Sequence, residues 1–224
     1  MSEQAYQAPI LTVDGVILQF VQQQLQVLVI QRANEPFQGM EALPGGYIVA
    51  GETTQFSLAR ILDQKAGIAL SELRLIEQLY TFDTVARDPR GHAVSVTYMG
   101  LGSALTPRHG DTQAPRFVPV DALPDLAFDH GAIIAYARAR LRNKLTYTNA
   151  VFALLPECFT LTQLQDAYEA IMGRSLDKRN FRRTFLSLNL IEATPFQHRD
   201  GAHRPARLYR FLDQTLVDIA RSLD

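Results

Sequence analysis

The residues best suited to chemistry in the first half of the chain lie in segment 46–68, GYIVAGETTQFSLARILDQKAGI. We expect residues 53–65 to form a helix after a loop. Positions 61, 64 and 65 would share one face of that helix, because residues three and four apart are neighbours on a helix surface. Carboxylates there would converge on Mg²⁺, which requires oxygen ligands in near-octahedral geometry. The face instead carries Ile61, Gln64 and Lys65, and the remaining carboxylate, Glu52, is too little to hold a metal.

The same segment resembles the Nudix box, G-x5-E-x7-R-E-U-x-E-E-x-G-U, in which U is a bulky apolar residue. The residues that keep its register are Gly46, Glu52, Arg60, Leu62, Gly67 and Ile68. The three acidic positions of the core are those held here by Ile61, Gln64 and Lys65. In a Nudix hydrolase, metal ions at these positions activate water and neutralise a pyrophosphate. A Nudix frame whose acidic positions carry Ile61, Gln64 and Lys65 therefore indicates a ligand sensor rather than an enzyme, with no catalytic residue and no metal site. We expect Glu52 to pair with Arg60 or Lys65.

Composition and charge narrow the class of protein. The 224 residues are 47% apolar and include one cysteine, Cys158, which excludes an intrachain disulfide. No signal-peptide pattern and no apolar run of transmembrane length occur, so we expect a cytoplasmic protein. Residues 1–137 carry 8 Lys and Arg against 14 Asp and Glu, whereas residues 138–224 carry 14 against 9. This asymmetry between a net −6 and a net +5 half indicates nucleic-acid binding by the C-terminal part.

The N-terminal unit, residues 1–146, alternates strands with two long helices. The expected strands are 9–20, 25–32, 72–81, 93–101 and 117–120, with a glutamine turn at 22–24. The first helix, 53–65, ends at Gly67, a plausible C-cap. The second runs from Phe128 to Arg142, and we take 128–143 as a connecting helix. This order predicts an α/β (α+β) sandwich with a mixed sheet.

The C-terminal unit, residues 147–224, has the element order of a winged helix-turn-helix. A short helix is expected at 148–155, and Thr160 with Gln163 forms a capping box for the next helix, which Gly173 ends. Asp177 can cap a further helix at 178–188. Strands at 190–197 and 206–212 enclose a charged loop and complete the wing.

Basic residues gather on this unit. Residues 174–210 contain nine Lys and Arg against three acidic residues, a net charge of +6. DNA binding requires cations that replace condensed counterions, and a helix that enters the major groove. The candidate DNA-binding residues are Arg174, Lys178, Arg179, Arg182, Arg183, Arg199, His203, Arg204 and Arg207.

Four features together resemble the NrtR family of Nudix-related transcriptional regulators of NAD metabolism. They are the degenerate box, the loop YTFDTVARDPRGHAVSVTY, the segment LAFDHGAIIAYARARLR and the C-terminal winged helix. The resemblance covers nearly the whole chain. It implies a homodimeric repressor that binds palindromic operator DNA near NAD genes and senses ADP-ribose in the former substrate pocket. It implies no required cofactor, and in many members ligand binding releases the DNA.

Without a metal, a diphosphate needs arginine and backbone N–H donors instead. The candidates for such contacts are Arg32, Gly45, Gly46, Arg60, Arg87 and Arg90, although Arg60 is also the expected partner of Glu52. Tyr47, Phe82 and Phe128 are candidates to stack on adenine, and His92 and His130 to hydrogen-bond a ribose.

Two alternatives remain open from the sequence. An active Nudix pyrophosphohydrolase would require a catalytic carboxylate from elsewhere, such as Glu77 or Asp83. A non-enzymatic RNA-binding or scaffold protein is less well supported, because no aromatic stacking platform accompanies the basic stripe.

Overall fold

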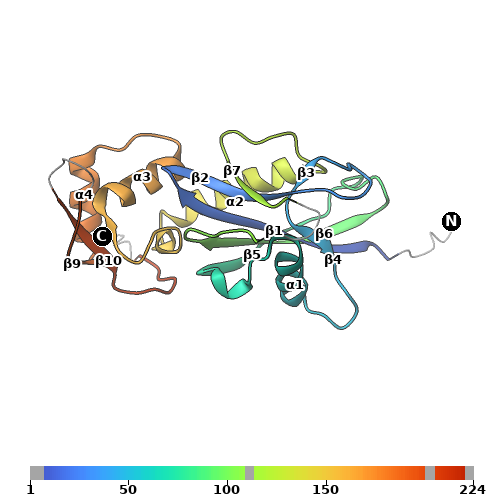
Figure 1. Ribbon diagram of the computed structural model, residues 1–224, viewed down its shortest axis with the longest axis horizontal. Helices are drawn as coiled ribbons and strands as arrows, with labels where there is room; N and C mark the ends of the chain where they lie inside the picture. Colours follow the sequence, from blue (N-terminus) through green and yellow to red (C-terminus); the bar gives the residue numbers. More distant parts are fainter. Residues whose placement is uncertain (1–7, 109–113, 200–204, 220–224) are drawn as a thin grey trace, which may run out of the picture.

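The computed structural model describes residues 8–108, 114–199 and 205–219, so the candidates His203 and Arg204 lie outside the described residues. The fold is elongated, with a sheet-based unit at one end and a helical unit with a small sheet at the other (Figure 1). None of the helices in the described ranges has the length and apolar character needed to cross a bilayer.

A seven-stranded mixed sheet forms the N-terminal unit. Its main path is β3-β2-β1-β6-β5, with β4 paired to β1 and β7 to β2. The strands are β1 (Ile10–Val21), β2 (Gln24–Gln31), β3 (Glu41–Ala42), β4 (Gly45–Tyr47), β5 (Leu75–Phe82), β6 (Ala93–Gly102) and β7 (Arg116–Pro119). The β1–β6 pair is parallel and the other pairs are antiparallel, which confirms the expected mixed sheet.

Helices cover both faces of this sheet. Helix α1 (Thr54–Ala66) packs on the face that carries Val13 and Ile17. Helix α2 (His130–Lys144) packs on the opposite face, which carries Val16 and Leu18. Because successive strand residues point to opposite faces, β1 is apolar almost throughout and lies at the centre of a sandwich.

The predicted turns and caps of this unit occur, with shifted boundaries. Gln22 and Gln23 both have positive φ, 52° and 61°, as a two-residue hairpin turn between strands of right-handed twist requires. Helix α1 begins after Thr53, whose side chain accepts from the backbone N–H of Phe56, and ends at Gly67 with φ 60°. Helix α2 begins two residues later than predicted, because Phe128 has φ 56° and cannot belong to a helix. Strand β5 also starts later, because 70–72 form a 3-10 turn, η1 (Leu70–Glu72).

The C-terminal unit has the predicted winged helix-turn-helix order. Its elements are η2 (Ala150–Ala153), β8 (Phe159–Thr160), α3 (Leu161–Met172), α4 (Lys178–Ser187), β9 (Ile191–His198) and β10 (Ala206–Phe211). The capping box of Thr160 and Gln163 has both of its hydrogen bonds, and Asp177 caps α4 through the Asn180 N–H at 2.7 Å. The helix predicted at 148–155 is reduced to the short 3-10 segment η2.

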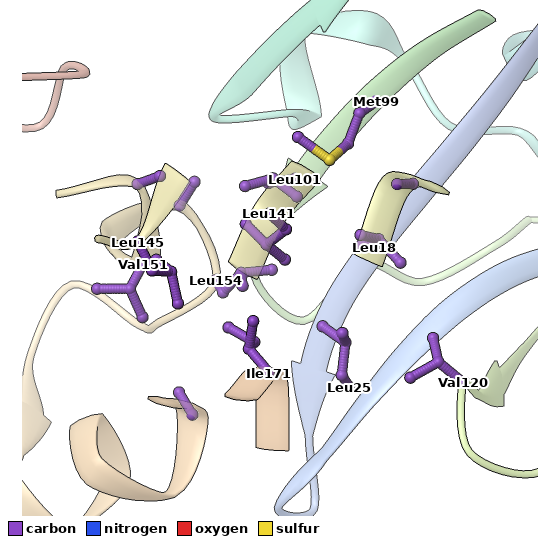
Figure 2. Close-up of a cluster of buried hydrophobic side chains, with 14 of the residues drawn as sticks. Leu18, Leu25, Met99, Leu101, Val120, Leu141, Leu145, Val151, Leu154 and Ile171 are labelled. Atoms are coloured by element: carbon purple, nitrogen blue, oxygen red, sulfur yellow. The ribbon is translucent and has the colours of Figure 1, made fainter. Parts of the chain in front are cut away.

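One apolar cluster joins the two units. It includes Leu18 and Leu25 from the sheet, Leu141 from α2, Val151 from η2 and Ile171 from α3. Figure 2 shows these side chains converging from both units. Helix α2 is central to this cluster, so the winged unit packs directly on the sandwich and its helix.

Candidate functional site

A cavity of about 210 Å³ lies at the end of the sandwich where α2 begins. Strands β1, β2 and β4, the last turn of α1, loop 87–90 and the first residue of α2 all contribute to its lining. Eight predicted ligand residues line it: Arg32, Gly45, Gly46, Tyr47, Arg87, Arg90, Phe128 and His130. Predicted residues from four separate segments of the chain are therefore brought to one place.

Two glycines bring bare backbone to this cavity. A Cβ at Gly45 would lie 1.8 Å from Oδ1 of Asp14, and a Cβ at Gly46 would lie 3.3 Å from Cδ1 of Ile61. Only glycine fits at position 45, since real Cβ atoms do not approach other heavy atoms below about 3 Å. The backbone can therefore approach a ligand closely, as it does in anion-binding loops.

The two arginines of loop 87–90 line the cavity and are paired with carboxylates. Arg87 is 5% exposed and donates from Nε and Nη2 to Asp129 at 2.9 and 2.7 Å. Arg90 donates to both oxygens of Asp88 and, through Nη1, to the Tyr47 hydroxyl at 2.7 Å. Burial by itself would raise the pKa of Asp88. The hydrogen bonds and charge of Arg90, together with the charge of Arg87, outweigh burial and hold this pKa below its ordinary value. An anionic ligand would therefore share or displace these carboxylates.

Arg32 and Phe128 form the aromatic side of the cavity. The Arg32 guanidinium lies 4.6 Å from the Phe128 ring centroid, a cation–π distance. Its Nε donates to the Pro36 carbonyl at 2.8 Å. Phe37 packs edge-on against Phe128 at 4.9 Å. Burial and the charge of Arg90 lower the pKa of Arg32 from its ordinary value.

His130 joins α2 to the cavity wall. It is 4% exposed, and its Nδ1 accepts the Leu43 N–H at 2.9 Å, while Nε2 lies 3.8 Å from Oδ1 of Asp14. Burial lowers the pKa of this imidazole below 6.5 in spite of the neighbouring carboxylates, so the ring is neutral at pH 7. With Nδ1 occupied as an acceptor, the proton lies on Nε2, the nitrogen left for a ligand or for Asp14.

Arg60 does not line the cavity, contrary to its place among the predicted ligand residues. Its guanidinium donates to Glu52 from Nε at 2.9 Å and from Nη2 at 2.7 Å, and also to the Tyr47 carbonyl. Glu52 accepts a further bond from Ser57 at 2.7 Å. The Arg60 and Ser57 hydrogen bonds hold the pKa of Glu52 at about 2. The expected Glu52–Arg60 pairing is thus confirmed, and it explains why Arg60 is directed away from the ligand site.

Phe82 also lies outside the cavity lining. It packs with Tyr80 and Tyr136, at ring-centroid distances of 5.3 and 5.7 Å, in a cluster between β5 and α2. Its place in strand alternation directs it to this cluster and not to the cavity lining.

The three altered box positions do not converge, contrary to the expectation from helical spacing. Ile61 is 1% exposed in the core beneath the sheet, and Gln64 is exposed. Only Lys65 reaches the cavity, where its Nζ donates to the Gly45 carbonyl at 2.6 Å. Within the described ranges, no group of three or more His, Cys, Asp and Glu side chains is arranged to hold a metal ion.

Sequence reasoning missed two buried carboxylates at the cavity. Asp14 is 6% exposed and accepts from the Ser95 hydroxyl at 2.5 Å, and Asp88 is 4% exposed. Asp14 interrupts the apolar run TVDGVIL of β1, and a charged residue in a buried strand was the signal that could have identified it. The carboxylates named as substitute catalysts lie elsewhere: Glu77 pairs with Lys144 at 2.7 Å, and Asp83 is exposed and outside the cavity lining.

A second candidate surface lies on helix α4. Lys178, Arg179 and Arg183 are exposed, while the opposite face buries Phe185 against Tyr168 of α3. Helical periodicity creates this division. Lys178 and Arg179 lie in the first turn of α4. In helix-turn-helix proteins, the N-terminal residues of the recognition helix are those that contact base edges.

The remaining candidate DNA-binding residues differ in solvent exposure and in their hydrogen bonds to the protein. Arg182 is half-buried and donates to Thr162 on α3 at 3.0 Å, so it supports the helix pair in addition to any DNA contact. Arg174 is exposed in the turn between α3 and α4. Arg199 and Arg207 are exposed on the wing, whereas His203 and Arg204 fall outside the described residues.

The chain is similar to known families over both units. Residues 10–137 match the NUDIX domain family, and residues 151–211 match the NrtR DNA-binding winged helix domain family. It is 39% identical over 212 residues to the "ADPR responsive transcriptional repressor NtrR" of Acinetobacter baylyi, covering 92% of this chain and 83% of that protein.

Solved structures give the same assignment. The crystal structure of Shewanella oneidensis NrtR complexed with a 27mer DNA is 35% identical with a TM-score of 0.78, covering 90% of this chain and 93% of that chain. The NUDIX domain of Shewanella oneidensis NrtR, complexed with ADP ribose, is 36% identical with a TM-score of 0.56, covering 63% of this chain and 94% of that chain. The likeness extends through both units and their junction. The chain belongs to the NrtR family of Nudix-related transcriptional regulators.

Proposed function

We propose that this chain is a transcriptional repressor of NAD-metabolism genes that binds palindromic operator DNA as a homodimer and senses ADP-ribose without hydrolysing it. The observation that carries the proposal is a cation-lined, glycine-floored cavity joined by one helix to a winged unit with an exposed basic helix. The relatives described above, which include a repressor responsive to ADPR and a NUDIX domain bound to ADP ribose, support it.

The chemistry of the cavity suits ADP-ribose. A diphosphate requires cationic and backbone donors, and arginines, Lys65 and the β4 backbone line the cavity. Phe128 supplies an aromatic face, and Tyr47, 52% exposed, stands at the mouth. The cavity volume of about 210 Å³ is smaller than the roughly 300–1,000 Å³ typical of ligand pockets. A ligand as large as ADP-ribose would therefore extend beyond the cavity across its mouth, within reach of Tyr47.

Helix α2 supplies a physical connection between ligand and DNA. At its N-terminus, Asp129 holds Arg87 and His130 binds the Leu43 N–H. Toward its C-terminus, Arg142 donates to the Ile171 carbonyl of α3 at 3.1 Å, and Leu141 packs in the shared core (Figure 2). A ligand that changes the first contacts would shift the winged unit through a rigid helix.

A shift of the winged unit would change the distance between the two recognition helices of a dimer, and DNA binding depends on that distance. In a two-fold dimer, recognition helices must enter half-sites about 34–36 Å apart. A ligand that favours another spacing weakens DNA binding, and DNA weakens ligand binding by the same factor.

Fluorescence anisotropy on labelled operator DNA tests the proposal. We expect tight binding by the free protein and a loss of affinity when ADP-ribose saturates the cavity. Unchanged DNA affinity at saturating ADP-ribose would refute the ADP-ribose response.

Absence of hydrolysis is part of the proposal, and a separate assay tests it. Glu52 is paired with Arg60, and Glu77 lies away from the cavity. The two carboxylates that line the cavity, Asp14 and Asp88, each lie beside an arginine. We expect no AMP from ADP-ribose in the presence of Mg²⁺. Mg²⁺-dependent release of AMP would restore the hydrolase alternative.

A further inference from the structure

The donor set at the former metal positions of the Nudix box does not suit a divalent cation. Position 61 presents a hydrocarbon to the core, position 64 an amide to solvent, and position 65 an ammonium to the cavity. Mg²⁺ binds oxygen ligands and is repelled by an ammonium. The cavity must therefore neutralise an anionic ligand by other means.

Lys65 is placed to do so. Its Nζ donates to the Gly45 carbonyl at 2.6 Å, directly beside the backbone that forms the cavity floor. An ammonium has three donors, so two N–H groups remain after this bond. Among the described residues, no carboxylate lies within 4.0 Å of Nζ, whereas Arg87 has two, Asp129 and Asp14, and Arg90 has one, Asp88.

Arg32 is the second cation of the cavity without a carboxylate partner among the described residues. It donates to two backbone carbonyls, those of Pro36 and Asn34. Burial and the charge of Arg32 both lower the pKa of Lys65, while Asp14 partly offsets them. Two partly buried cations that repel each other and lack a direct anionic partner are costly, and a bound anion removes that cost.

We propose that Lys65 and Arg32 form a metal-free clamp for the diphosphate, in which the Lys65 ammonium takes over the charge-neutralising role of the metal in Nudix hydrolases. The Gly46 backbone and the phenyl face of Phe128 adjoin this clamp on the same cavity. The inference rests on the proposed function for the identity of the natural ligand. It adds that recognition is centred on the diphosphate and does not need a divalent cation.

Isothermal titration of the full chain with ADP-ribose and with ADP tests the clamp, in excess EDTA and in MgCl₂. We expect the wild type to bind ADP-ribose as tightly in EDTA as in MgCl₂. Lys65→Gln removes the charge and keeps an N–H donor on a side chain one atom shorter. We expect it to weaken the binding of both ligands by roughly ten- to a hundredfold, the loss of a charge-assisted hydrogen bond. Lys65→Arg should recover most of the affinity because it restores a cation.

Gln64→Ala is the matched control, since it alters an exposed residue of the same helix turn, and we expect unchanged affinity. Thermal melting of each variant separates a folding defect from a lost ligand contact. A wild type that binds only with Mg²⁺, or a Lys65→Gln variant with wild-type affinity, would overturn the clamp. Metal-independent binding of ADP but not of ADP-ribose would uphold the clamp and refute the proposed effector, and binding of neither ligand would refute both.

Discussion

The Arg87–Asp129 pair offers the sharpest test of how the cavity is connected to α2, through the substitution Asp129→Asn. Asparagine keeps one oxygen acceptor but loses the charge and one of two hydrogen bonds to a guanidinium that is 5% exposed. Complete breakage of a buried pair costs about 3–5 kcal/mol. Here Asp14 remains 3.8 Å from Arg87, and Asp129 is 23% exposed, so both effects reduce the cost.

We expect a loss of about 2 kcal/mol, close to the value of one hydrogen bond to a charged group. For a chain of this length each kcal/mol corresponds to about 2–4 °C, so Tm should fall by about 4–8 °C. Saturating ADP-ribose should narrow this difference, because its diphosphate replaces Asp129 as the acceptor for Arg87.

Thermal denaturation with and without ADP-ribose measures both quantities. Asp125→Asn is the matched control, since it makes the same chemical change at an exposed residue just before α2, and its Tm should stay at the wild-type value. An Asp129→Asn difference that ADP-ribose leaves unchanged or widens would show that Arg87 does not meet the diphosphate.

Three further predictions concern other parts of the chain. Arg179→Ala should weaken operator binding, and if Arg179 contacts a phosphate it should also reduce the slope of log K against log salt by about 0.9. Fluorescence anisotropy across a salt series measures both quantities. Unchanged affinity would exclude Arg179 from the interface. In the wild type, the Glu52–Arg60 pair stabilises the fold above pH 4.5, and this stability is lost as pH falls toward 2, because the folded pKa of Glu52 is about 2. Glu52→Gln should lack this contribution, so its stability should depend less on pH in this range. Equal acid unfolding of the wild type and the variant would contradict this. Gly45→Ala should lower stability by about 1–3 kcal/mol and abolish ADP-ribose binding, because its Cβ would meet Asp14 Oδ1 at 1.8 Å; a variant that melts and binds like wild type would disprove the steric argument.

Local features were predictable because they depend on neighbouring residues. The Thr160–Gln163 capping box, the Gly67 helix end and the Gln22–Gln23 turn are set by backbone conformations and side chains a few residues apart. The element order followed from them, and the two family matches agree with it.

Only the tertiary structure shows which candidate side chains line the cavity and which carboxylate each arginine pairs with. Arg60 and Arg87 look alike in the sequence, yet Arg60 is held by Glu52 beyond the cavity and Arg87 lies in its wall. The spacing of 61, 64 and 65 indicates one helical face, but a face about 100° wide meets the core at one edge and solvent at the other. Sequence distance does not say where those boundaries fall.

The sequence by itself determined that this chain has a Nudix frame without its acidic core and a basic winged helix, because both are patterns of residue type at fixed spacing. Only the tertiary structure decided that Lys65 bonds to Gly45 and that Asp14 and Asp88 are the buried carboxylates of the cavity. It also decided that Leu18, Leu141 and Ile171 share one core across the two units. These contacts join residues 20 or more positions apart, and only the packing of strands and helices in three dimensions fixes which of them meet.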